Sequence, residues 1–215
     1  MPELPTLIIL AESESRPTTA ARQRSGGNTA TASESTLETV QHTLQKGLAS
    51  GLQVILVAPP MVAAQCHHLL PAGHVILLPD HPTGAIGGSN DQMALGVAVA
   101  VIASAQSPGW LLLPADMPLL QTSTLKLMGQ AVMQDPLVFP EYRHLRGHPI
   151  GFSAEFYSEL IRLQRERDLQ RLLAQYPARG VDVDDPGILM AEDNHHDLAL
   201  LRTVLQGHTS LSVHP

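Results

Sequence analysis

The sequence predicts an α/β fold in three layers, with helices on both faces of a mostly parallel sheet. Short apolar runs typical of buried strands alternate along the chain with longer segments of helical periodicity. Strands that alternate with helices in this way form crossover units, and these produce parallel sheets. The chain has 215 residues, an ordinary length for one such domain, and its hydrophobic content of 44% is enough for a core.

The elements follow in chain order. Strands are expected at residues 7–10, 54–57, 75–78, 110–115 and 137–139, with an edge strand where valines alternate with acids at 181–183. Helices are expected at 35–48, 61–70, 92–104 and 122–133, and after caps at Asp168 and Asn194. The first helix is expected to begin at a capping box formed by Ser35 and Glu38. Residues 12–35 are expected to form a long loop.

Composition excludes several classes of function. The net charge is −7, and Lys126 is the only Lys or Arg between Gly47 and Tyr142, so no basic stripe for nucleic acid is expected. The single cysteine, Cys66, excludes an intrachain disulfide and a cysteine-rich zinc site. No apolar run approaches the 18 or so residues of a membrane span. We therefore expect a soluble, cytoplasmic protein with no membrane contact.

One acid stands where α/β proteins bind ligands. Asp116 follows the apolar run 110–115, and open α/β sheets bind ligands in the crevice outside the carboxyl ends of their strands. A carboxylate at that position suits Mg²⁺, which takes one or two protein carboxylates and completes its shell with water and phosphate. The alternative is that Asp116 caps the following helix.

Three further segments make this position more specific. The sequence Leu-Pro-Ala-Asp-Met-Pro-Leu at 113–119 is followed by Arg-Gly-His-Pro at 146–149, Val-Asp-Val-Asp-Asp-Pro-Gly at 181–187 and Asp-Asn-His-His-Asp-Leu at 193–198. In this order the segments resemble the molybdenum-cofactor nucleotidyltransferase family. The Arg-Gly-His-Pro element is most similar to the cytidylyltransferase branch. The resemblance covers roughly residues 4–205.

The resemblance implies a Rossmann-like nucleotidyltransferase fold and a single MobA-like NTP transferase domain over residues 1–205, followed by a frayed tail at 206–215. It implies transfer of CMP from CTP to a molybdopterin-type phosphate, with Mg²⁺ and release of pyrophosphate. A molybdoenzyme or a maturation protein would then be a partner. Two alternatives stay open: a catalytically inactive relative that binds a nucleotide, a pterin or a protein, and a nucleotidyltransferase for another acceptor such as a sugar phosphate.

The same resemblance assigns roles to individual residues. Asp116 and Asp193 would hold the metal, and Arg146 and Arg16 would stabilise charge on the phosphates. The nucleotide would contact Leu10, Ala11, Gly87, Gly88, Gln92 and Asp116, and the acceptor would contact Arg146, Gly147 and His148. Four of these assignments have a structural alternative: Arg146 in a surface ion pair, His148 bonded to a backbone carbonyl, Asp193 as a helix N-terminal acid, and the Gly87–Gly88 segment as the start of a plain helix capped by Asn90.

The first loop departs from the family pattern. The family has a glycine-rich start, an Arg, a Gly and a Lys, whose N–H groups and charge surround the triphosphate. Here Glu12 or Ser13 replaces the first glycine, and Pro17, which has no N–H, follows Arg16. Glu12 would repel a phosphate by about 1 to 4 kcal/mol over a few ångströms. The sequence therefore predicts weakened triphosphate binding and impaired transfer.

Overall fold

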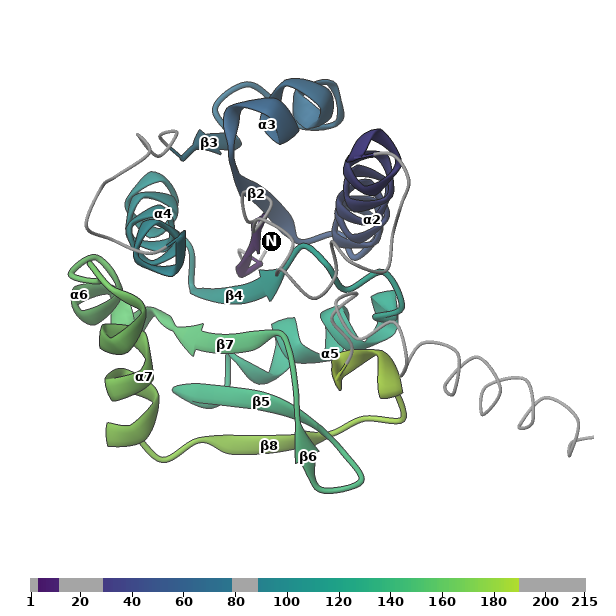
Figure 1. Cartoon of the computed structure of the whole chain (residues 1–215). Helices are drawn as coiled ribbons and strands as arrows, with labels where there is room; N and C mark the ends of the chain where they lie inside the picture. The colour runs from purple at the N-terminus through teal and green to yellow at the C-terminus, as the bar shows by residue number, and fades with distance from the viewer. Residues whose placement is uncertain (1–3, 12–28, 79–88, 190–215) are drawn as a thin grey trace, which may run out of the picture.

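The computed structural model describes residues 4–11, 29–78 and 89–189 (Figure 1). In this part of the chain eight strands form one sheet in the order β3-β2-β1-β4-β7-β5-β6, with β8 also paired to β5. The strands are β1 (Thr6–Leu10), β2 (Gln53–Ala58), β3 (Val75–Leu77), β4 (Gly109–Pro114), β5 (Leu137–Tyr142), β6 (Leu145–Arg146), β7 (Ile150–Ser153) and β8 (Arg179–Asp182).

The sheet is mostly parallel, as the sequence predicts. β1 pairs in parallel with both β2 and β4, and β5 pairs in parallel with β8. β7 runs antiparallel between β4 and β5, and β6 runs antiparallel at the end of β5. The carboxyl ends of β1, β4, β5 and β8 therefore lie at one edge of the sheet, together with the amino end of β7.

Helices cover both faces of this sheet (Figure 1). They are α2 (Thr29–Ala49), α3 (Pro60–Cys66), α4 (Ser89–Ala103), α5 (Thr122–Ala131), α6 (Tyr157–Leu160) and α7 (Glu166–Gln175), with short 3₁₀ turns η1 (His67–Leu69), η2 (Ala154–Phe156) and η3 (Pro186–Leu189). Alternate residues of β1 point to opposite faces. Leu7 and Ile9 pack with α2, α3 and α5, whereas Ile8 packs with α4, α6 and α7.

The structure corrects some expected boundaries. α2 begins at Thr29, so Ser35 lies inside the helix and does not cap it. The Ala- and Glu-containing sequence before Ser35 is compatible with a helix, which explains the earlier start. Asp168 accepts the backbone N–H of Arg165 at 2.9 Å from the first turn of α7, so it caps the helix from within. Asn194 and residues 206–215 lie outside the described residues.

Two strands had no counterpart in the sequence prediction. β6 ends at Arg146, the first residue of the polar Arg-Gly-His-Pro element, and β7 begins directly after the element. Neither an apolar run nor an alternation of apolar and polar residues is long enough there to indicate a strand. The Cys66 side chain is buried in α3 and forms no disulfide. None of the described helices has both the length and the apolar character needed to span a bilayer.

Candidate functional site

The chain order changes direction between β1 and β4. β2 and β3 extend the sheet on one side of β1, and the chain then returns to place β4 on the other side. Ligands of open α/β sheets bind in the crevice at such a switch point. Leu10 pairs with Pro114 at this position, and its carbonyl accepts the backbone N–H of Ala115 at 2.9 Å. Asp116, half-buried, is the next residue.

The other described nucleotide-site residues lie near this crevice. Ala11 follows β1, is buried, and donates its N–H to the carbonyl of Val57 at 2.9 Å. Gln92 is half-buried in the first turns of α4, and the next residue, Met93, packs in the same hydrophobic cluster as Leu10. Asn90 lies inside α4, which begins at Ser89, so it is not the residue before the helix.

The loop that carries Asp116 is held from several sides. Met117 and Leu120 are buried beneath it, with exposed fractions of 2% and 1%. Lys46, on α2, donates from Nζ to the carbonyl of Leu120 at 2.9 Å. The loop then leads directly into α5, whose first turn is held by a carboxylate from another part of the chain.

That carboxylate is Asp185, which follows β8. Its Oδ2 accepts the N–H of Gln121 at 2.8 Å and the hydroxyl of Thr124 at 2.6 Å, and its Oδ1 accepts the N–H of Gly187 at 2.9 Å. The side chain is 2% exposed. Asp185 therefore caps α5 from a distant segment, and its charge is balanced by three donors and the N-terminus of the helix.

Sequence reasoning gave Asp185 no role. Its bond to Gly187 is an Asx turn, and the sequence Asp-Pro-Gly is a signal for such a turn. The bonds to Gln121 and Thr124, in contrast, join residues 64 and 61 positions apart in the chain. Local patterns carry no information about such pairs.

The Arg-Gly-His-Pro element lies at the same edge of the sheet as Asp116. Ile150, the first residue of β7, pairs with Leu112 of β4, so residues 147–149 lie beside the carboxyl end of β4. The N–H of Gly147 bonds to the carbonyl of Pro140 at 3.0 Å, and that of His148 to the carbonyl of Ile188 at 2.9 Å. Asp116 and the Arg-Gly-His-Pro element therefore lie at the same edge of the sheet.

Gly147 permits a close approach within the protein itself. A Cβ at this position would overlap the carbonyl oxygen of Ile188 in η3. The carbonyl of Ile188 also holds the N–H of His148, so any larger residue at 147 would displace this contact. The glycine therefore lets η3 lie against the Arg-Gly-His-Pro element.

Arg146 forms the ion pair that the sequence left open as an alternative. Its Nε lies 2.9 Å from Oε1 of Glu141, and its guanidinium carbon lies 5.5 Å from the ring centroid of Phe139. The Arg146 side chain is 54% exposed. Exposed pairs of this kind contribute about 0 to 1 kcal/mol, so the pair would be a weak competitor for an anionic ligand.

The surroundings of the His148 ring bear on one of its two expected roles, the bond to a backbone carbonyl. The backbone N–H of His148 bonds the carbonyl of Ile188, and the ring bonds no carbonyl of the described residues. Nδ1 of the ring is buried and has no hydrogen-bond partner among the described residues. Burial lowers the pKa of His148 below its usual value of 6.5, which favours the neutral imidazole at neutral pH.

The remaining predicted site residues, Arg16, Gly87, Gly88 and Asp193, lie outside the described residues. Within residues 4–11, 29–78 and 89–189, no group of three or more His, Cys, Asp or Glu is arranged to hold a metal. A site that takes most of its ligands from water and phosphate needs only one or two carboxylates. Asp116 fits such a site for Mg²⁺ by its chemistry and its place at the crevice.

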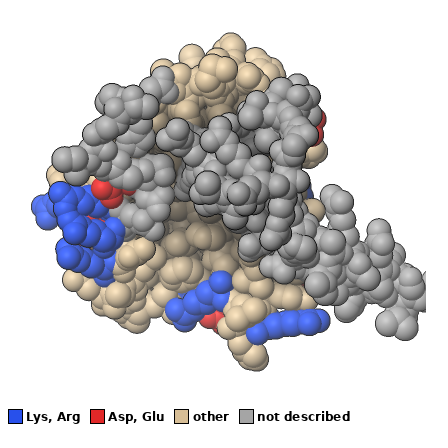
Figure 2. Space-filling model, in the orientation of Figure 1, with Lys and Arg blue, Asp and Glu red and all other residues tan. Residues whose placement is uncertain are grey.

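Few Lys or Arg residues among those described lie near the edge of the sheet that carries Asp116. Figure 2 shows Lys and Arg gathered in two places on one face, over α6 and α7 and at the β5–β6 hairpin. Of the hairpin residues, Arg146 is paired with Glu141, and Arg143 lies 5.1 Å from the ring centroid of Tyr142. Asp182, the last residue of β8, and Asp184 are exposed near the hairpin.

Solved structures support the fold. Rv0371c from Mycobacterium tuberculosis H37Rv is 20% identical, with a TM-score of 0.66 over 93% of this chain and 97% of that one. Its complex with manganese gives 19% identity and a TM-score of 0.59, over 90% and 97%. CMP:2-keto-3-deoxy-manno-octonic acid synthetase complexed with CTP gives 12% identity and a TM-score of 0.55, over 96% and 99%.

At these identities the structures show the fold alone. No curated protein matches the chain. The family model of the MobA-like NTP transferase domain, however, matches residues 21–181, which include β2 to β7, β8 up to its last residue, Asp116 and the Arg-Gly-His-Pro element. The chain has the nucleotidyltransferase fold and belongs to the MobA-like NTP transferase domain family.

Proposed function

We propose that this protein transfers CMP from CTP to a molybdopterin-type phosphate in the cytoplasm, with Mg²⁺, and releases pyrophosphate. One observation carries the proposal. Asp116, at the switch point between β1 and β4, shares an edge of the sheet with Gly147 and His148. A nucleotide in the crevice and an acceptor beside the Arg-Gly-His-Pro element would then meet at the end of β4.

The reaction needs no nucleophile from the protein, because an acceptor phosphate oxygen attacks the α-phosphorus of CTP in line with the departing pyrophosphate. Mg²⁺, when bound, would stabilise charge on the phosphoryl oxygens. Asp116 would supply a carboxylate to that ion, with Asp193 as a second. Arg16 and Arg146 would stabilise charge directly, Arg146 after exchanging Glu141 for a phosphate. His148, neutral, would donate one hydrogen bond to the acceptor.

The comparisons support parts of this proposal. A manganese complex of a structural neighbour is consistent with a divalent ion, and a neighbour complexed with CTP is consistent with a cytidine nucleotide. The nucleotide would also contact Leu10, Ala11 and Gln92, and the Gly87–Gly88 segment. A molybdoenzyme or maturation protein would receive the product.

Calorimetric titration tests the nucleotide site. CTP, GTP and ATP are titrated with and without Mg²⁺ into the parent protein and Asp116→Asn, with Asp182→Asn as a matched control for an exposed acid. We expect Mg²⁺-dependent binding that prefers CTP, lost in Asp116→Asn and kept in Asp182→Asn. Equal binding by Asp116→Asn and the parent would make Asp116 structural and refute the assignment.

A second function, binding without turnover, is favoured by the first loop. Glu12 or Ser13 and Pro17 stand where the family has glycines, Glu14 adds a further carboxylate, and no Lys precedes Lys46. Pyrophosphate release with CTP, Mg²⁺ and molybdopterin separates the two: slow release above the Asp116→Asn background supports the enzyme. Binding of CTP with release no faster than that background supports the inactive relative.

A further inference from the structure

A cavity lies at the opposite edge of the sheet from Asp116, beside the amino end of β5. It has a volume of about 580 Å³, within the range of small-molecule sites. Leu137 at the amino end of β5, η2, α6 and the segment after α7 line it. The proposed nucleotide site is at the carboxyl ends of β1 and β4, on the same side as the carboxyl end of β5, so the length of the strands separates the two.

One wall of this cavity is aromatic. The rings of Phe156 and Tyr176 stand edge to face, with centroids 4.9 Å apart and planes at 77°. Phe156 is buried and also packs against Phe152, with centroids 5.4 Å apart, so its position is fixed by the core. Tyr176 is 41% exposed and lines the cavity from the end of α7. The wall therefore offers a rigid ring and an accessible one.

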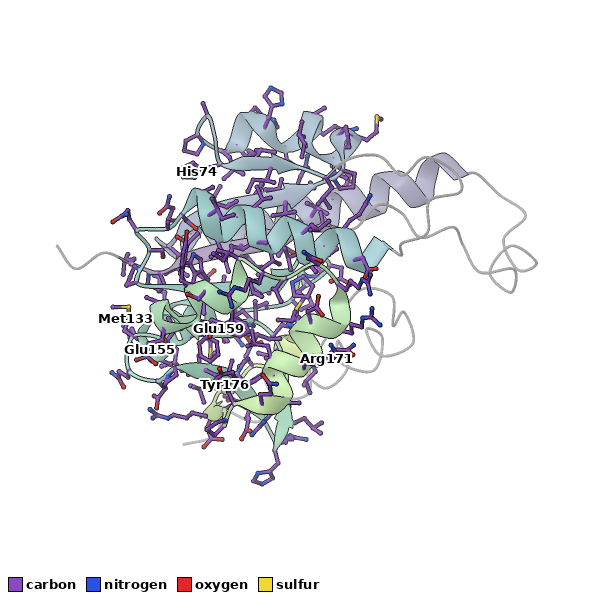
Figure 3. The ribbon with its side chains drawn as sticks, turned by 90° about the vertical axis from the view of Figure 1, so that its left-hand side faces the viewer. His74, Met133, Glu155, Glu159, Arg171 and Tyr176 are labelled. Carbon is purple, nitrogen blue, oxygen red and sulfur yellow. The ribbon has the colours of Figure 1, made fainter. Side chains whose placement is uncertain are left out.

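Acidic side chains also line the cavity. Asp135 and Arg179, both lining the cavity, form an ion pair, so their charges cancel. Glu155 and Glu159 also line it, and neither has an ion pair among the described residues. Figure 3 shows Glu155, Glu159 and Tyr176 around the same region, with Arg171 farther along α7. Within the part of the chain that the structure describes, the cavity therefore carries two carboxylates without an ion-pair partner.

A buried oxygen atom of Glu159 is a second observation at this cavity. Its Oε2 is buried and makes no hydrogen bond within the described residues. A buried acceptor without a donor is destabilising, and a carboxylate more so than a neutral group. A cation beside the Glu159 carboxylate would offset this cost through its charge, whereas a phosphate or a carboxylate would be repelled.

We propose that this cavity binds an organic cation, namely an amidinium, guanidinium or ammonium group attached to a flat apolar body. The cationic group would pair with Glu159 and Glu155. The apolar body would lie against Phe156 and Tyr176, whose rings also attract a cation. The site is separate from the proposed nucleotide site, and the proposal does not depend on that function.

Benzamidine is the probe, since it joins a planar cation to an aromatic ring. It is titrated by calorimetry into the full chain and into Glu155→Gln, Glu159→Gln and the double variant. Glu38→Gln, an exposed acid on α2, is the matched control. Benzyl alcohol and benzoate are the neutral and anionic comparisons. We expect binding of benzamidine alone, weakened on the order of tenfold by each cavity substitution and unchanged by Glu38→Gln.

Tyr176→Ala should also weaken binding, and its exposed position makes misfolding a small risk. Three results would overturn the proposal: no binding of benzamidine by the parent, equal affinity in the parent and the double variant, or equal affinity for benzoate. Asp116→Asn separates this site from the nucleotide site, because benzamidine should bind that variant as it binds the parent.

Discussion

Replacing Asp185 by Asn should destabilise the protein strongly, although the two side chains have almost the same shape. Asp185 is buried and accepts three hydrogen bonds, two at Oδ2 and one at Oδ1. An Asn side chain has only one acceptor oxygen. If that oxygen faces Gln121 and Thr124, its amide nitrogen faces the N–H of Gly187, and two donors then oppose each other.

The cost follows from the bonds lost. One hydrogen bond to a charged acceptor contributes about 1.5 to 3 kcal/mol, and a buried N–H without an acceptor costs about 1 to 3 kcal/mol. Because these terms overlap, we expect Asp185→Asn to lower the free energy of unfolding by about 2 to 4 kcal/mol. Thr124→Val removes one of the bonds at Oδ2 and should cost about 1.5 to 3 kcal/mol.

Urea unfolding measures this effect. With a slope of about 2 kcal/mol per molar urea, the midpoint of Asp185→Asn should fall by about 1 to 2 M. Asp184→Asn, an exposed neighbour, is the control and should leave the midpoint almost unchanged. A midpoint for Asp185→Asn within the error of the Asp184→Asn value would refute the reasoning, because it would mean that the three bonds add no net stability.

Two further predictions concern the Arg-Gly-His-Pro element. Gly147→Ala should lower the free energy of unfolding by about 3 kcal/mol or more, since its Cβ overlaps a backbone carbonyl that cannot rotate away. Urea unfolding tests this. An unchanged urea midpoint would show that η3 moves freely and would contradict the prediction. His148 has a folded-state pKa below the unfolded value of 6.5, so the unfolded state binds more protons in acid. The stability of the parent should be full above that pH and should fall as the pH decreases from 6.5 toward the folded-state pKa. His148→Asn should reduce this slope in urea midpoints measured between pH 7.5 and 5, roughly the range in which a histidine titrates, and identical slopes would contradict the assignment.

The sequence predicts the fold well because buried strands and helices place apolar residues in recognisable runs and periods along the chain. Leu7, Ile8 and Ile9 are all apolar, as expected for a strand buried on both faces, and each packs into one of the two cores. β6 and β7 show no such apolar pattern. They are short and lie at the two ends of the polar Arg-Gly-His-Pro element, so only their pairing with β5 and β4 defines them as strands.

The residues of the candidate site also differ in how far the local sequence predicts their position. Asp116 is predictable because its position depends on the strand immediately before it. The ion pair between Arg146 and Glu141 is less so, because it depends on the tight turn at Arg143 and His144, whose φ angles are 51° and 67°. The role of Asp185 is not predictable from local sequence, since it requires the end of β8 to lie beside the start of α5.

The segment η3 connects the two halves of the candidate site. On one side the Ile188 carbonyl holds the His148 N–H, and Gly147 leaves room for this contact. On the other side a Cβ at Gly187 would overlap the carbonyl of Leu119, in the loop that carries Asp116. The relative position of the Arg-Gly-His-Pro element and of Asp116 therefore depends on η3, in which Ile188 contacts the first and Gly187 lies against the loop of the second. It follows that a substitution in η3 should disturb both elements together, whereas a substitution within one of them should act mainly on that one.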